Sequence, residues 1–268
     1  MTSNVKWLNE YSRDFRIPLG IKQGGINSPD FFGLYIDDIC AILRDSSIGC
    51  HIYRIFLAMI LFADDLVLLA PTRQALNKMI QACASYCKEF CLAFNASKSK
   101  IIVFSKTKID HENLCPILLN GRKVEYVNSI TYLGATITND KGFSFSASND
   151  LTKFYRASNS ILRAVKQPSE EVLIHLLYSC CIPILSYASA VKDFTSRQMQ
   201  DCSTAINNAL RLIFGYNRWE SVRMLRQSFG YPSLVEIFQR AKNKFNSSVL
   251  THHNPIISNF ARYLALEQ

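Results

Sequence analysis

The sequence predicts an α+β protein with two regions, and three observations support that prediction. Short apolar runs, turn residues and two helical patterns fill residues 1–140, whereas helical periodicity dominates residues 141–268. The 268 residues are 49% hydrophobic and 19% charged, which is typical of a globular chain that buries a sizeable core. We therefore expect a domain over 1–140 with a short antiparallel sheet and helices, followed by an all-helical domain over 141–268.

The composition also excludes several classes of protein. The longest apolar run, Ile55–Phe62, is too short to cross a bilayer, so no membrane partner is expected. The chain does not begin with the basic and apolar segments of a signal peptide. Its nine cysteines are odd in number and include no CxxC pair, which argues against a disulfide framework or a zinc knuckle and favours a reducing compartment.

The net charge of +9 is concentrated in the second region. Residues 1–140 hold 15 basic and 13 acidic side chains, whereas residues 141–268 hold 15 and 8. Such an excess fits a polyanionic partner such as nucleic acid. A mildly basic, solvated surface is the alternative, and charge alone does not decide between the two.

The first helix is predicted from Ser28, which can cap free N–H groups, and from Pro29, which suits a first helical turn. Apolar residues at helical spacing continue to Leu43. The segment Tyr35-Ile36-Asp37-Asp38 falls inside this pattern. We therefore interpret its two carboxylates as part of a helix surface and not as a catalytic pair.

A hairpin of two buried strands is predicted next, from the apolar runs Ile55–Phe62 and Leu66–Ala70. Between them lie Asp64 and Asp65. Two carboxylates about 4 Å apart repel by about 4 kcal/mol at an effective dielectric constant of about 20, and a divalent cation removes that repulsion. Mg²⁺ prefers oxygen ligands together with water and substrate phosphates. The pair therefore indicates a metal site, with a solvated Asp-Asp turn as the alternative.

The rest of the first region is predicted from turn and cap residues. Thr72 caps a second helix, which has an apolar face that ends near Phe90 and includes or borders Cys83, Cys87 and Cys91. We interpret these thiols as small buried hydrophobes and not as metal ligands. The other expected elements are a short buried strand over 101–104, a hairpin over 117–127 with a type I′ turn at Asn120-Gly121, and a strand over 130–133 that ends at Gly134.

In the second region, helices are expected over 145–166, 169–180, 196–213, 219–229 and 233–250. The residues that mark breaks between them are Pro168, Pro183, Gly215, Gly230 and Pro232.

Three further segments add context to the Asp pair. Gln23 and Gly24 lie in a glycine-containing loop before the first helix, where the backbone can approach a nucleotide closely. Lys98 follows the second helix and can reach a phosphate. Tyr132-Leu133-Gly134 comes later. Taken singly, the segment at Gln23 and Gly24 is more simply an ordinary loop, and Lys98 is more simply a residue on a solvated face.

The order and spacing of these four segments resemble the palm of a reverse transcriptase. The form Phe62-Ala63-Asp64-Asp65 is similar to that of the non-LTR (LINE-like) retrotransposon and group II intron enzymes, and residues 211–220 look like their thumb and downstream region. The resemblance covers most of the chain. It implies a partial polymerase palm followed by a helical, thumb-like region.

The resemblance also implies roles for individual residues. Asp64 and Asp65 would be the catalytic, metal-binding carboxylates, with Mg²⁺ or Mn²⁺ as cofactor. Gln23, Gly24 and Lys98 would bind the incoming nucleotide and template. The turn Tyr132-Leu133-Gly134 would grip the primer end. The reaction would be two-metal nucleotidyl transfer.

The implied partners are an RNA template, a DNA primer, deoxynucleoside triphosphates and the remainder of a parent polyprotein, which would act in a cytoplasmic or nuclear ribonucleoprotein. The family's fingers and an earlier strand with another catalytic aspartate are expected to be missing, because only 19 residues precede Gly20. We therefore expect little or no polymerase activity from the isolated chain.

Two alternatives remain open. The chain could be a non-catalytic remnant that binds nucleic acid, because Tyr216 and Trp219 lie among the arginines of the basic second region and could stack on bases. Equally, the two aromatic residues could belong to the core and the arginines to a solvated face. It could also be a decayed element without a stable product, since a missing palm strand would leave an exposed sheet edge.

Overall fold

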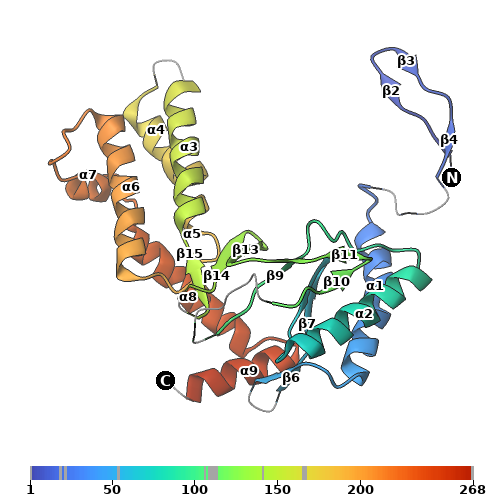
Figure 1. Cartoon of the computed structure of the whole chain (residues 1–268). Helices are drawn as coiled ribbons and strands as arrows, with labels where there is room; N and C mark the ends of the chain where they lie inside the picture. The colour runs from blue at the N-terminus through green and yellow to red at the C-terminus, as the bar shows by residue number, and fades with distance from the viewer. Residues whose placement is uncertain are drawn as a thin grey trace. The chain divides into compact units, whose positions relative to one another are not determined.

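The chain is an α+β protein, as the sequence predicts. The computed structural model describes residues 2–17, 20, 23–52, 55–105, 107, 114–140, 142–164 and 168–266. These form two compact units, one of residues 1–99 and 116–124 and the other of residues 100–115 and 125–268. Figure 1 shows small sheets and helices in the first unit and mostly helices in the second. The boundary at residue 140 between a polymerase palm and a thumb-like region stays a prediction, because the two compact units are defined only by how the chain packs.

The first unit begins with two short antiparallel pairs. Strand β1 (Thr2–Ser3) pairs with β4 (Phe15–Arg16), and β2 (Lys6–Trp7) pairs with β3 (Glu10–Tyr11). Most of these residues are exposed. Further along the chain, β5 (Cys50–Ile52) pairs with β6 (Ile55–Leu57), and β7 (Met59–Phe62) pairs with β8 (Asp65–Leu68).

Among the described residues, two helices supply most of the buried cluster of the first unit. Helix α1 (Ser28–Asp45) buries Ile36, Ile39 and Leu43 against the apolar face of α2 (Arg73–Glu89). The Thr72 side chain accepts a hydrogen bond from the Ala75 N–H at 3.1 Å, which confirms the predicted cap. The predicted cap at Ser28 is wrong. The helix already includes Ser28, and Asn27 occupies the cap position without a side-chain capping bond.

The predicted strand over 55–62 is also corrected. It is two strands that break at the buried Ala58, whose carbonyl oxygen accepts a hydrogen bond from the Leu69 N–H at 2.7 Å. The strands β7 and β8 are half-buried or exposed, not buried, since Ile60 and Phe62 are 43% and 61% exposed. The tight hairpin of β10 (Leu118–Leu119) and β11 (Arg122–Lys123) is confirmed, with positive φ at both Asn120 and Gly121 as a type I′ turn requires.

The described part of the second unit includes two small sheets. Strand β9 (Lys100–Ile101) is shorter than predicted, and it runs parallel to β12 (Glu125–Tyr126). This pair is therefore an exception to the antiparallel sheet that the sequence predicts. Strands β13 (Ser129–Tyr132), β14 (Ala135–Thr138) and β15 (Ser144–Ser146) form an antiparallel sheet. The strand β15 lies where the sequence predicts the start of a helix.

Helices build the remainder of the second unit. They are α3 (Ser148–Ala164), α4 (Glu170–Leu176), the π-helical turn η1 (Leu177–Cys181), α5 (Ile182–Ser186), α6 (Ser196–Phe214), α7 (Arg223–Ser228), α8 (Leu234–Leu250) and α9 (Pro255–Leu266), the last of which the sequence analysis missed. Helices α3, α4 and α6 lie side by side around a core that includes Phe154, Ile174 and Leu210 (Figure 1).

The predicted break between helices at Pro183 is wrong. Helix α4, η1 and α5 follow one another without a gap, and Pro183 lies in the first turn of α5. Proline removes one backbone donor, and a π-helical turn directly before it accommodates that loss. Among the described residues, no helix combines the length and the apolar character needed to cross a bilayer.

Candidate functional site

The two candidate catalytic carboxylates lie at the tip of the β7–β8 hairpin. Phe62 pairs with Asp65, so Ala63 and Asp64 form a two-residue turn. Ala63 adopts a left-handed φ of 51°, which a residue with a Cβ rarely occupies. Asp64 therefore projects from the turn, whereas Asp65 begins β8, and both side chains are exposed. Strain of this kind is a reason to suspect a functional role.

The hairpin presents two adjacent, exposed carboxylates. Within the described residues, neither Asp64 nor Asp65 forms an ion pair, and no group of three or more potential metal ligands occurs. Mg²⁺ is commonly held by one or two carboxylates together with water and substrate phosphates. The two side chains fit the protein's share of such a site.

The candidate nucleotide-binding residues lie on exposed loops. Gly24 has a φ of 78°, and a Cβ there would meet nothing within 4 Å, so the conformation and not crowding favours glycine. Gln23 and Lys98 are exposed. Asn95 shapes the turn before Lys98, because its side-chain oxygen accepts a hydrogen bond from the Ser97 N–H at 3.1 Å. No hydrogen bond or ion pair found in the described part of the chain joins these loops to the hairpin.

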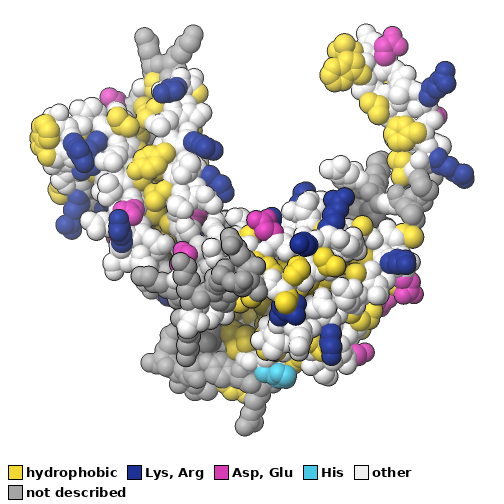
Figure 2. Space-filling model, viewed as in Figure 1, with side chains coloured by type: hydrophobic (Ala, Val, Ile, Leu, Met, Phe, Trp, Pro, Cys, Tyr) yellow, Lys and Arg dark blue, Asp and Glu magenta, His cyan; other side chains and the backbone are white. Residues whose placement is uncertain are grey.

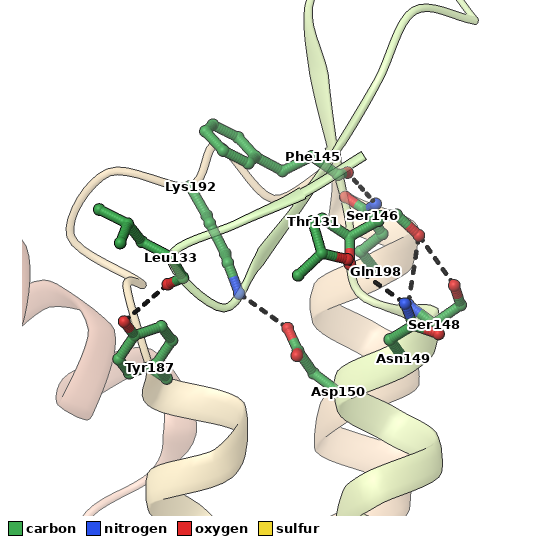
Figure 3. Close-up of polar contacts among 11 residues, drawn as sticks. Thr131, Leu133, Phe145, Ser146, Ser148, Asn149, Asp150, Tyr187, Lys192 and Gln198 are labelled. Atoms are coloured by element: carbon green, nitrogen blue, oxygen red, sulfur yellow. Dashed lines mark hydrogen bonds and ion pairs between the residues drawn. The ribbon is translucent and has the colours of Figure 1, made fainter. Parts of the chain in front are cut away.

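The turn predicted to grip the primer closes the β13–β14 hairpin in the second unit. Tyr132 pairs with Ala135, while Leu133 and Gly134 have φ values of 45° and 78°. The Tyr187 hydroxyl donates a hydrogen bond to the Leu133 carbonyl oxygen at 2.8 Å (Figure 3). A Cβ on Gly134 would lie 3.0 Å from the Tyr187 ring, so both the backbone and its neighbour favour glycine.

Polar contacts connect the β13–β14–β15 sheet to helix α6, and the loop that follows α5 to helix α3. The buried Lys192 ammonium donates to the Asp150 carboxylate in the first turn of α3 at 2.7 Å (Figure 3). The Gln198 side chain at the start of α6 donates to the Phe145 carbonyl oxygen at 2.9 Å. Sequence reasoning missed Tyr187, Lys192 and Asp150. Their partners are 42 to 54 positions away, and no local spacing signals them.

Replacing Gly134 by Ala is expected to lower the free energy of unfolding by about 1–2 kcal/mol, because a left-handed conformation costs that much for a residue with a Cβ. The Tyr187 ring must also shift. Urea denaturation measures the change. Gly142→Ala is the matched control, since Gly142 has a φ of 87° but no atom within 4 Å of an added Cβ. A loss for Gly134→Ala that is equal to or smaller than that of the control would contradict the contact.

The structure confirms the predicted helical position of Asp37 and Asp38 and the predicted burial of two of the three cysteines. Asp37 and Asp38 lie exposed on α1, and no hairpin surrounds them. Cys83 and Cys87 are buried in the core of the first unit, and burial raises the pKa of the Cys83 thiol to about 12, so it stays protonated and unreactive. Cys91, in contrast, is exposed and lies beyond the helix.

The basic stretch after α6 presents its aromatic residues to solvent. Trp219 is 83% exposed and Tyr216 is 41% exposed, so neither is a core residue. The Arg211 Nε donates a hydrogen bond to the Glu220 carbonyl oxygen at 3.0 Å, and this bond links the two ends of the loop between these residues. Figure 2 shows Lys and Arg side chains interspersed with hydrophobic ones over the helical part of the chain.

Comparison with known proteins places these residues in context. The family described as "Reverse transcriptase (RNA-dependent DNA polymerase)" matches residues 4–137. A curated relative is the "Retrovirus-related Pol polyprotein from type-1 retrotransposable element R2" of Popillia japonica, which is 23% identical over 206 residues. That alignment covers 74% of this chain and 33% of the relative, so the chain spans about a third of the relative's length.

Proposed function

Because the chain belongs to the reverse transcriptases of the non-LTR type, we propose that it is a portion of an RNA-directed DNA polymerase. Its substrates would be a DNA primer, an RNA template and deoxynucleoside triphosphates, and the rest of a Pol polyprotein would be its partner. The observation that carries the proposal is the exposed Asp64-Asp65 pair on a strained two-residue hairpin inside the matched segment.

In the proposed reaction, the primer 3′-hydroxyl oxygen attacks the α-phosphorus of the nucleotide. A new P–O bond forms, pyrophosphate leaves, and the hydroxyl proton passes to solvent. Asp64 and Asp65 would hold Mg²⁺ or Mn²⁺, which when bound supplies the positive charge that stabilises the entering and leaving oxygens. Reverse transcriptases generally use divalent ions of this kind.

The other candidate residues would position the substrates. The exposed Lys98 ammonium would attract the triphosphate, and the loop at Gln23 and Gly24 would lie along the nucleotide and template. Tyr132, Leu133 and Gly134 would hold the primer end. These roles are carried by the family resemblance and by the exposure of the loops.

We further propose that this chain needs a complementing segment for activity. Two-metal catalysis requires more ligands than the two carboxylates of the hairpin, and no group of three potential ligands occurs among the described residues. A segment that corresponds to the fingers and first catalytic strand of a family member would supply the missing carboxylate.

Primer extension tests the proposal. A labelled DNA primer on an RNA template is incubated with deoxynucleoside triphosphates, Mg²⁺ and the chain, with and without the complementing segment. We expect extension only in the complemented reaction. A folded chain that extends no primer in either reaction would contradict the polymerase assignment, and robust extension by the chain alone would contradict the need for a partner segment.

A second candidate function is nucleic-acid binding without catalysis, and the exposure of Trp219 favours it. A large apolar ring in solvent gains by stacking on a base. Arg218 and Arg223, also exposed, flank this tryptophan and can neutralise phosphates. This surface is compatible with both functions, so only the extension assay separates them.

Replacing Trp219 by Ala is expected to weaken binding to single-stranded RNA by roughly 1–3 kcal/mol, the usual loss when one stacked base is released. Fluorescence anisotropy at several salt concentrations measures the dissociation constant. The slope against salt should stay unchanged, because the substitution removes no charge. Trp7→Ala is the matched control, since Trp7 is 77% exposed in the first unit. Equal losses for the two variants would contradict a specific role for Trp219.

A further inference from the structure

A side chain from outside its own sheet, that of Tyr187, contacts the Leu133–Gly134 turn. Tyr187 follows α5, and its hydroxyl donates a hydrogen bond to the Leu133 carbonyl oxygen (Figure 3). Its ring lies next to Gly134. The Tyr187 side chain is still 52% exposed. A half-exposed tyrosine adds little to a hydrophobic core, so its directed hydrogen bond is the more specific part of this contact.

The loop that carries Tyr187 is itself fixed. The Ser189 and Lys192 N–H groups donate to the carbonyl oxygens of Ser186 and Ala188, at 3.1 and 3.0 Å. The Lys192 ammonium lies 5.9 Å from the centre of the Tyr187 ring and is paired with Asp150. The ammonium is fully buried and its partner nearly so, and the ion pair joins the loop to the first turn of α3.

The turn is a conformation that needs external support. Leu133 is a branched residue with a φ of 45°, and such backbone persists only where the surroundings over-determine it. A bond to the Leu133 carbonyl oxygen constrains the peptide between the two left-handed residues. Loss of this bond would allow the turn to relax without disrupting the sheet, which keeps its own register from Ser129↔Thr138 to Tyr132↔Ala135.

We propose that Tyr187 is a positioning residue for the primer 3′ end, acting through the Leu133–Gly134 turn, and that the Lys192–Asp150 pair fixes Tyr187 for this role. The inference rests on the proposed function. A reacting group that is misplaced by about 1 Å can lose about a hundredfold in rate, so a device that fixes this turn has a catalytic consequence without touching the reacting atoms.

The test uses the full chain and a readout that does not require catalysis. A DNA primer with 2-aminopurine as its 3′-terminal base is annealed to an RNA template and titrated with the chain. The fluorescence of 2-aminopurine reports how the terminal base is held, and anisotropy of the same sample reports overall affinity. The variant is Tyr187→Phe, which keeps the ring and removes only the hydroxyl. Tyr155→Phe, at a 43% exposed tyrosine on α3, is the matched control.

With Tyr187→Phe, we expect the 2-aminopurine signal of the bound primer to move toward that of the free primer. The dissociation constant should rise by no more than about fivefold, the equivalent of one net hydrogen bond. Tyr155→Phe should behave like the wild type. Circular dichroism and urea denaturation verify that both variants fold.

A Tyr187→Phe signal identical to that of the wild type, with the primer bound in both, would overturn the positioning role and leave the polymerase proposal intact. If the wild-type chain itself leaves the terminal base unperturbed, the role assigned to the turn fails with it. That second failure is visible in the wild type before any variant is compared. The two proposals can therefore fail separately.

Discussion

Replacing Asp64 by Asn is expected to reduce the rate of single-nucleotide addition in the complemented reaction by at least about a thousandfold, because a metal-binding carboxylate contributes several kcal/mol of transition-state stabilisation. Asn keeps the size and one oxygen of the side chain but removes its charge. Asp64 lies in a turn and is exposed, so the substitution should leave the fold unchanged. Single-turnover primer extension, with saturating nucleotide and Mg²⁺, measures the rate.

The chain provides a matched control in its other adjacent aspartate pair. Asp37 and Asp38 lie on the exposed surface of α1, away from any hairpin turn. Asp37→Asn makes the same change of charge at a position outside the hairpin. We expect this variant to keep the wild-type rate to within about twofold, a difference well under 1 kcal/mol in the barrier. Equal losses in the two variants would show that net charge, and not the hairpin, controls the reaction.

Replacing Lys192 by Met is expected to lower the free energy of unfolding by about 3–5 kcal/mol, because it leaves a buried carboxylate without its partner. The Lys192 side chain is fully buried and that of Asp150 is 8% exposed, so water cannot readily replace the lost ammonium. Urea denaturation followed by far-UV circular dichroism measures the change. The loss should appear in the transition that reports the helical unit, since both residues belong to it.

The double variant Asp150→Asn with Lys192→Met separates the ion pair from simple packing. Once the carboxylate is neutral, the missing ammonium leaves no buried charge behind, and most of the lost stability should return. If the double variant is as unstable as Lys192→Met alone, the loss comes from the volume and contacts of the lysine stem. In that case the ion pair would not be what fixes the loop at Tyr187.

Features that depend on neighbouring residues were predictable from the sequence. The cap at Thr72 needs only a hydroxyl three residues before an amide, and the turn at Asn120-Gly121 needs only two residues that tolerate positive φ. The helical position of Asp37 and Asp38 followed from apolar spacing on both sides of them. The Asp64-Asp65 hairpin was found for the same reason, because its turn and both its strands are contiguous in sequence.

Features that depend on tertiary partners were not predictable. No local sequence signal marks Asp150 and Lys192, and only the fold brings them into a buried pair. Tyr187 contacts a turn 54 residues before it. Pro183 was expected to end a helix, but the π-helical turn before it and the packing of Ile182 and Leu185 keep the path helical. The exposure of Trp219 was left open because an aromatic residue suits both a core and a surface.

Metal binding at the hairpin tests the central assignment most directly, because it needs no complementing segment and no turnover. Mn²⁺ is titrated into the chain with primer–template and a deoxynucleoside triphosphate, and free Mn²⁺ is followed by electron paramagnetic resonance. We expect the wild type and Asp37→Asn to bind Mn²⁺ alike, and Asp64→Asn to bind it at least about tenfold more weakly, because one charged oxygen ligand is lost. Equal binding by the wild type and Asp64→Asn would contradict the assignment of this hairpin as the metal site.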